Sequence, residues 1–258
     1  MATGSQELFT FDVEGLSGTA ERLRGGYASA RPFPHAVIDD FLPEPVARQL
    51  LRSFPAPDSD IWLDWKKRDI VHQPKKLGIG AAGRLRTDHP FIQHVLFAFN
   101  SYPVIHFLEQ LTGIEGLIPD PHYSGGGLHQ ILPGGKLAIH SDFNVHPLMK
   151  VWRRLNLLLY LNEDWRADYG GNLELWDGGM NRCIKSIAPL FNRCVVFNTD
   201  RRSYHGHPEP LNTPEGVTRK SLALYYYSAA PAPGEDEQRP VLWQRRPQEA
   251  VQAVAGDA

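Results

Sequence analysis

Short apolar runs, many alternating with polar residues, follow one another from Gly113 to Ser228. Gly, Pro, Asn and Asp, the residues that most often form turns, separate these runs. An apolar residue at every second position is the pattern of a strand with one buried face. The runs are GLHQIL, KLAIHSD, RLNLLLYLN, GNLELWD, CIKSIAP, CVVFN and SLALYYYS. This series of short strands predicts a β-sandwich or barrel.

Before Gly113 the apolar residues follow a different spacing. Residues 35–42 (HAVIDDFL) predict a strand and a turn, and residues 44–54 (EPVARQLLRSF) predict a helix. Residues 89–113 carry two helical patterns divided at Pro103, because proline cannot continue a helix from its interior. Two or three helices are therefore expected to support the β core.

The two ends of the chain have weaker patterns. Residues 1–32 are mixed and contain glycine, which suggests a peripheral lead-in. Residues 229–258 read as a Pro-rich, charged tail with one short helical segment around QEAVQAVA. We expect one domain over 1–258, with lead-in, helices and a possible lid in 1–112, a β core in 113–228 and a tail in 229–258.

Composition and charge narrow the range of partners. The chain has 258 residues, 42% of them hydrophobic and 22% charged, with a formal net charge of -2. Neither a nucleic acid nor a membrane is expected as a partner of such a chain. The first residues contain no basic region and no apolar run, so we expect a cytoplasmic protein, either monomeric or homodimeric. Cys183 and Cys194 are expected to be reduced thiols, with a single hairpin disulfide as the alternative.

A histidine and an aspartate stand two residues apart at the end of one apolar run, in IHSD. On a strand, His140 and Asp142 point to the same face, where they can share a metal ion. His205 in SYHGHPEP is the expected third ligand, with His207 as a rival and His146 as a weaker one. Two histidines and one carboxylate suit ferrous iron and leave coordination positions open. A structural zinc site would more often have four ligands, including cysteine.

An arginine and a serine enter the last aromatic strand, in RKSLALYYY. Arg219 and Ser221 would point to the same face, into a barrel that already holds the metal. A guanidinium in such a place needs an anion, and its fork of N–H groups suits a carboxylate. This combination predicts a pocket for a short diacid that chelates iron with one end and contacts Arg219 with the other.

From about Gly127 to Ser228 the chain resembles the iron(II)- and 2-oxoglutarate-dependent dioxygenases, in particular the prolyl-4-hydroxylase-like branch. The resemblance depends on the order and spacing of IHSD, YLNEDW, YGGNLELWD, SYHGHPEPL and TRKSLALYYY. It implies a mainly β fold, the double-stranded β-helix or jelly roll (a cupin-like barrel), supported by the N-terminal helices. It also implies the cofactor Fe(II) and the cosubstrates 2-oxoglutarate and O2.

The resemblance assigns roles to individual residues. His140, Asp142 and His205 match the iron ligands, Arg219 matches the partner of the far carboxylate of 2-oxoglutarate, and Ser221 matches its helper hydroxyl. Further cofactor-binding candidates are Tyr160, which would contact the same carboxylate or serve as a core aromatic, Gln130 and Asn156. Relatives that halogenate lack the carboxylate at the position of Asp142, so the resemblance implies hydroxylation of an unactivated C–H bond, with release of succinate and CO2.

The substrate is less defined by the sequence. A small molecule (amino acid, sugar or natural-product intermediate), with a carboxylate as one option, is our first expectation, and a peptidyl or protein prolyl group is the alternative. Residues 65–86 hold seven Lys or Arg against one Asp, so they form either a solvated loop or a lid over an anionic substrate. Further residues that would line the mouth of the pocket are His122, Tyr123, His129, Trp152 and Arg153.

Two other readings use the same barrel. A catalytically silent jelly-roll binding protein would be expected to lack part of the triad or the arginine, and both are present. A zinc-dependent cupin-like hydrolase or isomerase would give Arg219 and Ser221 no role.

Overall fold

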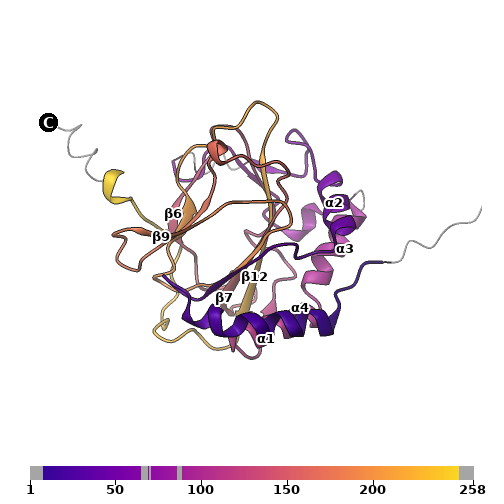
Figure 1. Cartoon of the computed structure of the whole chain (residues 1–258). Helices are drawn as coiled ribbons and strands as arrows, with labels where there is room; N and C mark the ends of the chain where they lie inside the picture. Colours follow the sequence, from indigo (N-terminus) through magenta and orange to yellow (C-terminus); the bar gives the residue numbers. More distant parts are fainter. Residues whose placement is uncertain (1–7, 65–68, 70, 86–88, 250–258) are drawn as a thin grey trace, which may run out of the picture.

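Two antiparallel sheets face each other at the centre of the protein (Figure 1). The structure is a computed structural model that describes residues 8–64, 69, 71–85 and 89–249. The larger sheet has the strand order β1-β10-β7-β12-β5-β3-β2, with β4 paired to β12, and the smaller has the order β13-β6-β11-β8-β9. The mainly β architecture agrees with the strand series expected from the sequence.

The strands of the larger sheet come from both halves of the chain. They are β1 (His35–Ile38), β2 (Leu63–Asp64), β3 (Lys76–Gly78), β4 (Ile118–Pro119), β5 (Gly127–Ile131), β7 (Trp152–Tyr160), β10 (Cys194–Asn198) and β12 (Arg219–Ser228). The strands of the smaller sheet are β6 (Leu137–Ser141), β8 (Leu173–Trp176), β9 (Cys183–Ile187), β11 (His205–His207) and β13 (Leu242–Trp243).

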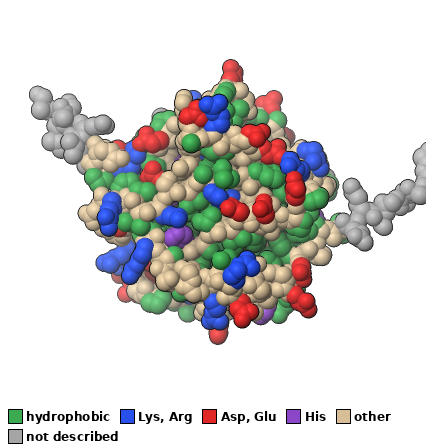
Figure 2. Space-filling view, viewed as in Figure 1, with side chains coloured by type: hydrophobic (Ala, Val, Ile, Leu, Met, Phe, Trp, Pro, Cys, Tyr) green, Lys and Arg blue, Asp and Glu red, His purple; other side chains and the backbone are tan. Residues whose placement is uncertain are grey.

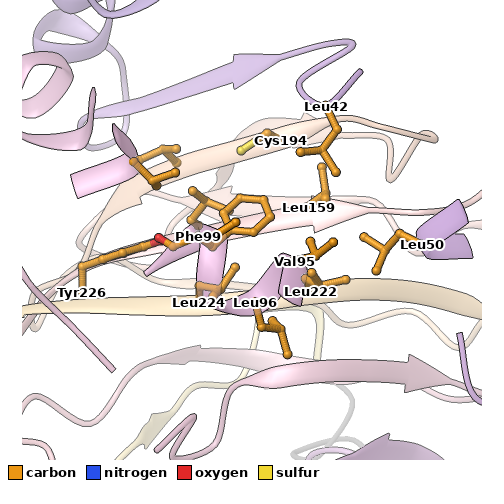
Figure 3. Packing of buried hydrophobic residues seen from close by; sticks show 14 of the residues in the cluster. Leu42, Leu50, Val95, Leu96, Phe99, Leu159, Cys194, Leu222, Leu224 and Tyr226 are labelled. Carbon is orange, nitrogen blue, oxygen red and sulfur yellow. The ribbon is translucent and has the colours of Figure 1, made fainter. Parts of the chain in front are cut away.

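Helices cover one face of the larger sheet. They are α1 (Val13–Ser29), α2 (Glu44–Arg52), α3 (Pro90–Phe99) and α4 (Tyr102–Thr112). Figure 3 shows Phe99 of α3 packed beside Leu222 and Leu224 of β12, on the same side as Leu159 of β7. The last three helices lie where helical spacing predicts them, and Pro103 stands in the first turn of α4, where a missing N–H costs nothing.

Helix α1 corrects the expectation of a peripheral lead-in over residues 1–32. It spans 17 residues, packs on α4 and β1, and buries Leu16, Ala20 and Tyr27. Asp12 caps its first turn by accepting hydrogen bonds from the backbone N–H groups of residues 14 and 15, both at 3.1 Å. Four glycines lie within the helix, and each costs about 1 kcal/mol of helix propensity relative to alanine. Packing of the buried apolar residues against α4 and β1 offsets this cost. The spacing of these residues is the signal in the sequence that could have predicted the helix.

The surface agrees with a nearly neutral chain. On the face shown in Figure 2, acidic and basic side chains are interspersed. None of the helices in the described part of the chain is long and apolar enough to cross a lipid bilayer. Both cysteines are free thiols, Cys194 buried in the core and Cys183 partly exposed.

Candidate metal centre and its cavity

The three residues predicted to bind metal converge between the sheets. His140 lies on β6, Asp142 directly follows that strand, and His205 begins β11, where it pairs with His140. One ligand atom from each residue lies within 4.8 Å of the other two. Nε2 of His140 is 3.6 Å from Oδ1 of Asp142, and Nε2 of His205 is 3.5 Å from Oδ2. The three donors therefore lie around one point.

Both imidazoles are held in an orientation that suits a metal. Nδ1 of His140 lies 2.9 Å from the carbonyl oxygen of Ala138, and Nδ1 of His205 lies 2.9 Å from that of Ser203. A carbonyl only accepts, so Nδ1 carries the hydrogen and Nε2 presents its lone pair to the shared point. Burial, followed by the neighbouring His140, lowers the pKa of His205 to about 4. The ring is therefore neutral at physiological pH, as a metal ligand must be.

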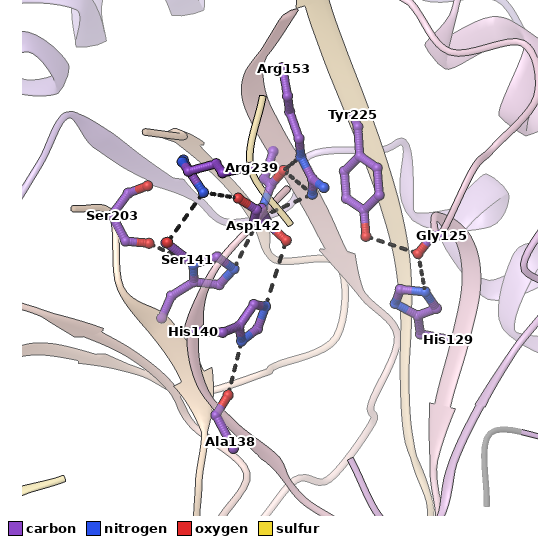
Figure 4. A network of polar contacts seen from close by, with 12 residues as sticks. Gly125, His129, Ala138, His140, Ser141, Asp142, Arg153, Ser203, Tyr225 and Arg239 are labelled. Atoms are coloured by element: carbon purple, nitrogen blue, oxygen red, sulfur yellow. Dashed lines mark hydrogen bonds and ion pairs between the residues drawn. The ribbon is translucent and has the colours of Figure 1, made fainter. Parts of the chain in front are cut away.

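The Asp142 carboxylate is fixed by two buried neighbours, of which Figure 4 labels Arg153. Asn156 Nδ2 donates to Oδ2 at 2.8 Å, and Nη2 of Arg153 lies 3.1 Å from the same oxygen. Burial by itself raises the pKa of Asp142, but the charge of Arg153, followed by interactions with His205 and His140, lowers it well below its usual range. Arg239 also donates a hydrogen bond to the carbonyl oxygen of Asp142. The residue is thus a carboxylate with a defined orientation.

A β-bulge brings Arg153 to this carboxylate. Along β7, Leu155 pairs with Tyr226 and Arg153 pairs with Tyr227, so two steps on β7 match one step on β12. Simple alternation would place Arg153 on the same face as Leu155, under the helices. The extra residue reverses the alternation and turns Arg153 toward the cavity beside Asn156, an effect typical of bulges near functional sites. Its guanidinium also lies 3.5 Å from the centroid of the Tyr225 ring.

Arg219 and Ser221 line the same cavity from β12, on the face predicted from their spacing. Nε of Arg219 donates to the carbonyl oxygen of Gly171 at 2.8 Å, and Nη2 lies 3.3 Å from the hydroxyl of Tyr160. The guanidinium carbon is 4.8 Å from the centroid of the Tyr160 ring. These contacts hold the guanidinium in place while the residue remains open to the cavity. Tyr160 therefore positions Arg219 rather than serving only as a core aromatic.

A glycine is required next to Arg219. Gly171, in the YGGN segment, has a φ of +71°, and a Cβ at this position would lie 3.1 Å from Cδ of Arg219 and 2.6 Å from Leu211. Any larger residue would strain the backbone at this φ and crowd the side chain of Arg219. This explains why the second position of the Gly-Gly pair in YGGN is a glycine.

Residues 126–227 match the sequence model of the 2OG-Fe(II) oxygenase superfamily, a segment that contains the three candidate ligands and Arg219. This segment, less than half of the chain, is similar to that superfamily. Curated relatives resemble a part of the chain. Prolyl 3-hydroxylase OGFOD1 of Mus musculus is 33% identical over 79 residues, which cover 29% of this chain and 14% of the relative. Prolyl hydroxylase EGLN3 of Homo sapiens is 31% identical over 78 residues, 30% of each chain. The chain thus spans less than a third of the length of either relative.

Two solved structures of prolyl hydroxylases share the fold. A prolyl hydroxylase from Trichoplax adhaerens, in complex with a hypoxia inducible factor oxygen degradation domain peptide fragment, has a TM-score of 0.59 at 17% identity. The comparison covers 84% of this chain and 92% of that one. A prolyl 4-hydroxylase from Phytophthora capsici has a TM-score of 0.57 at 19% identity, with coverage of 98% and 77%. The jelly-roll fold expected from the resemblance is confirmed.

The donor set fits a ferrous ion and its dianionic cosubstrate. Two imidazoles and one carboxylate form the facial arrangement typical of non-haem iron, and neither cysteine belongs to the cluster. A buried guanidinium in the same cavity would supply the charge that the far carboxylate of 2-oxoglutarate needs.

The cavity has a volume of about 260 Å³ and is lined by both sheets. An open groove of about 800 Å³ adjoins it, and the two share Gly125 and Phe143 in their linings. Pro147 and Pro240 contribute to the walls of the groove. A substrate larger than the cavity therefore has a place to extend beyond the metal centre.

The structure places Gln130 outside the cavity, which corrects its assignment as a cofactor-binding residue. Its Nε2 donates to Oγ1 of Thr218 at 2.7 Å, on the opposite face of β5 from His129 and Ile131, which do line the cavity. Successive side chains of a strand alternate between its two faces. The position of Gln130, ten residues before His140, does not show which face it occupies, because the Pro-Gly-Gly turn between the two strands interrupts the alternation. Asn156, by contrast, lines the cavity as expected.

The two rival histidines lie in different places. His146 is buried away from the metal centre, where its Nε2 lies 3.1 Å from Oδ1 of Asp120 and its Nδ1 accepts hydrogen bonds from two backbone N–H groups. His207 does line the cavity, but the cluster of three ligand atoms does not include it. Among the described residues neither of its ring nitrogens has a hydrogen-bond partner.

Only some of the other residues predicted at the pocket mouth line the cavity. His129 and Arg153 line the cavity, whereas Tyr123 is buried in the core and His122 and Trp152 are not among the lining residues. Of the basic segment 65–86, Lys66, Lys67, Arg68 and Arg86 lie outside the described residues. Lys76 begins β3 and lines the cavity, so this part of the segment is a strand of the sheet rather than a loop.

The sequence reasoning also missed Trp243. The tail contributes β13, which pairs with β6 so that Trp243 lies opposite His140. The Trp243 ring centroid is 5.0 Å from that of His140 and 4.4 Å from that of His72. The signal was the short apolar run VLW, which is too brief to predict a strand by alternation. Most of the predicted helix around QEAVQAVA lies outside the described residues.

Proposed function

We propose that the protein is an Fe(II)- and 2-oxoglutarate-dependent dioxygenase that hydroxylates a prolyl side chain in a peptide or protein. The observation that carries this proposal is one cavity that holds three convergent metal donors together with a buried arginine. In the reaction, 2-oxoglutarate and O2 yield succinate and CO2; one oxygen atom enters succinate and the other enters the C–H bond of the substrate as a hydroxyl group.

The residues of the chain would hold and orient the reactants. His140, Asp142 and His205 would bind Fe(II), which supplies the oxygen-activating chemistry when bound. Arg219, held by Tyr160, would bind the far carboxylate of 2-oxoglutarate and so direct its other end toward the metal. Apolar residues in the lining, among them Leu158 and Leu173, would exclude water from the space between Arg219 and the metal.

The prolyl substrate is supported by the relatives and by the groove. Both curated relatives are named as prolyl hydroxylases, and the Trichoplax structure holds a peptide fragment. The groove of about 800 Å³ beside the metal centre offers room for the residues on either side of a target proline. These findings favour the peptidyl alternative over the small molecule that we expected first.

A small acidic metabolite is the second candidate. It is supported by the small volume of the cavity, about 260 Å³, whose lining includes Lys76 as well as Arg153 and Arg219. Such a ligand would need no contact with the groove.

The test is anaerobic reconstitution with Fe(II) and 2-oxoglutarate, followed by exposure to O2. We expect slow succinate release without substrate and faster release with some members of a library of proline-containing peptides, each gaining one oxygen atom by mass spectrometry. Asp142→Ala serves as the inactive control. Failure of wild type to exceed this control in succinate release would overturn the dioxygenase assignment. Stimulation by free amino acids alone would favour the small-molecule candidate.

A further inference from the structure

His207 is a buried histidine that lines the cavity but lies outside the cluster of three metal donors. It is 3% exposed, and neither of its ring nitrogens has a hydrogen-bond partner among the described residues. An imidazole carries at least one N–H donor in either protonation state. Buried polar groups are generally hydrogen-bonded, so a donor without a protein partner at the wall of a cavity indicates a ligand. The position of His207 along the cavity indicates which ligand this is.

The smaller sheet places His207 away from the Asp142 end of the cavity. On β11, His205 pairs with His140 of β6, at the metal centre. His207 pairs with Leu137, at the start of β6, whereas Asp142 directly follows the other end of that strand. A step of two residues along a strand is about 6.6 Å, so His207 is displaced from His205 by about that distance.

The guanidinium of Arg219 lies at the same end of the cavity as His207. Extended by one residue, the antiparallel register of β11 with β8 places His207 level with Leu173. Two residues before Leu173, the carbonyl oxygen of Gly171 accepts the hydrogen bond from Nε of Arg219 at 2.8 Å. His207, Leu173 and Arg219 all line the cavity. The imidazole and the guanidinium therefore approach the same space from opposite sheets.

The open groove adjoins the cavity at its other end. The two share Gly125 and Phe143 in their linings, and Phe143 directly follows Asp142. The carbonyl oxygen of Gly125 accepts a hydrogen bond from the hydroxyl of Tyr225 at 3.0 Å, far along β12 from the arginine that begins this strand. A substrate that extends from the groove therefore reaches the metal centre before it reaches His207. The far end of 2-oxoglutarate is the ligand group that would meet this histidine.

We propose that His207 donates a hydrogen bond to the far carboxylate of 2-oxoglutarate, beside Arg219. This inference rests on the proposed function and adds a cosubstrate-binding residue to it. A carboxylate has two oxygens and about four acceptor sites, so it can accept hydrogen bonds from both side chains. Together they would favour 2-oxoglutarate over a metal chelator that has no far carboxylate. The histidine that the sequence offers as a rival metal ligand thus binds the other end of the cosubstrate.

Two variants of His207 separate the hydrogen bond from packing. His207→Leu removes the donor and keeps a bulky apolar side chain, whereas His207→Gln keeps an N–H donor. Two controls change residues outside the cavity lining. His35→Leu removes another buried histidine from a strand, and Lys75→Gln removes an exposed charge whose Nζ donates to the carbonyl oxygen of Pro133 at 2.8 Å. Thermal unfolding of each variant checks that it is folded.

The experiment measures ligand binding to Mn(II)-loaded protein by calorimetry without O2. The probes are 2-oxoglutarate and oxalate, which can chelate a metal but has no far carboxylate. We expect His207→Leu to raise the Kd of 2-oxoglutarate about tenfold or more, and His207→Gln to recover part of this loss. The Kd of oxalate should change by less than about twofold in every variant, because oxalate has no group at the position of the hydrogen bond. Both controls should bind both ligands as wild type does.

An unchanged Kd of 2-oxoglutarate in His207→Leu would overturn the proposal. Equal weakening of oxalate and 2-oxoglutarate would also overturn it, because His207 would then act at the metal. So would a His207→Gln variant that binds 2-oxoglutarate no better than His207→Leu, since packing rather than the hydrogen bond would then explain the loss.

A second measurement keeps the proposal testable if His207→Leu does not fold. Nuclear magnetic resonance of isotope-labelled histidine rings in Zn(II)-loaded wild type follows the N–H of His207, which is assigned as the signal missing in His207→Gln. This N–H should exchange more slowly with solvent when 2-oxoglutarate is added, and oxalate should not have this effect. No response to bound 2-oxoglutarate would overturn this inference alone. Failure of wild type to bind 2-oxoglutarate at all would overturn the proposed function as well.

Discussion

The two faces of the larger sheet have opposite chemistry although they share the same strands. Toward the helices, β7 and β12 present Leu155, Leu157 and Leu159 together with Leu222 and Leu224, all of them buried in the main core. Toward the smaller sheet, the same two strands present Arg153, Asn156, Arg219, Ser221 and Tyr225. Each of these two strands thus contributes to stability with the side chains of one face and to the site with those of the other face.

This division has a physical cause. The apolar face is close-packed, and burial of its side chains stabilises the fold. The cavity face holds charged groups that would be costly to bury without partners, and most of them are fixed by specific contacts such as Asn156 with Asp142. Changes on the two faces should therefore affect different measurable quantities.

The largest effect is expected from the metal donors. Replacing His140, Asp142 or His205 with alanine removes one of three donors, and we expect each variant to lose both Fe(II) binding and succinate release. Elemental analysis after anaerobic reconstitution measures the first and a succinate assay the second. Lys75→Gln, outside the cavity, should keep both.

His207→Ala sharpens the same test, because this residue lines the cavity but lies outside the three-atom cluster. It should bind Fe(II) as tightly as wild type. Loss of iron in His207→Ala combined with retention in His205→Ala would show that the ligand assignment is wrong.

Arg219→Ala should act on the cosubstrate. Loss of a charge-assisted contact that leaves its partner charge unpaired costs about 2–5 kcal/mol, which would raise the KM for 2-oxoglutarate about thirtyfold or more. Lysine should restore only part of the affinity, because an ammonium does not form the two parallel hydrogen bonds of a guanidinium. An unchanged KM would remove Arg219 from the cosubstrate site.

Leu157→Ala tests the opposite face. Leu157 is fully buried in the helix-covered core, so this change should lower the free energy of unfolding by about 2–5 kcal/mol, measured by urea denaturation. The KM for 2-oxoglutarate of the folded variant should remain that of wild type. A rise in KM comparable with that of Arg219→Ala would mean that the two faces are not independent.

The cysteines offer a chemical probe of the same packing. Burial raises the pKa of the Cys194 thiol, which lies fully inside the core, whereas Cys183 is partly exposed on β9. Under native conditions a thiol reagent should modify Cys183 first, and Cys194 should react only after unfolding, because the thiolate is the reactive form. Mass spectrometry of the modified protein measures the order. Native reaction of Cys194 would indicate that the core opens readily.

The smallest effect concerns a rim contact that belongs to neither face. Hydrogen bonds from Arg193, at 2.6 and 2.9 Å, lower the pKa of Asp39. A carboxyl group with a lowered pKa in the folded state contributes stability above its unfolded pKa of about 3.9, and that contribution is lost as the pH falls through the folded value. Asp39→Asn should therefore cost less than about 1 kcal/mol at pH 7, because Asp39 is 59% exposed, and nothing at strongly acidic pH. Urea denaturation at both pH values measures the difference, and an equal loss at both would remove the ion pair as its cause.

Much of this protein followed from local sequence patterns. The apolar runs predicted the strands from residue 127 onward except β11 and β13, and helical spacing predicted α2, α3 and α4. The spacing of His140 to Asp142 and of Arg219 to Ser221 put each pair on one face, because alternation is a property of the strand itself. The division of the chain into domains and the cytoplasmic location stay predictions.

Tertiary structure decided which faces meet and where alternation is interrupted. The bulge at residue 154 turns Arg153 toward Asp142, and pairing of β3 with β5 brings Lys76 into the cavity. Strand pairing also decides which face of β5 lines the cavity, and Gln130 lies on the other face. The pairing of β13 with β6 places Trp243 beside His140. Each of these outcomes depends on pairing with a strand elsewhere in the chain, and a shift of register by one residue moves every side chain to the other face. Local patterns carry no information about that register, because its free energy comes from contacts that form only when the sheets assemble.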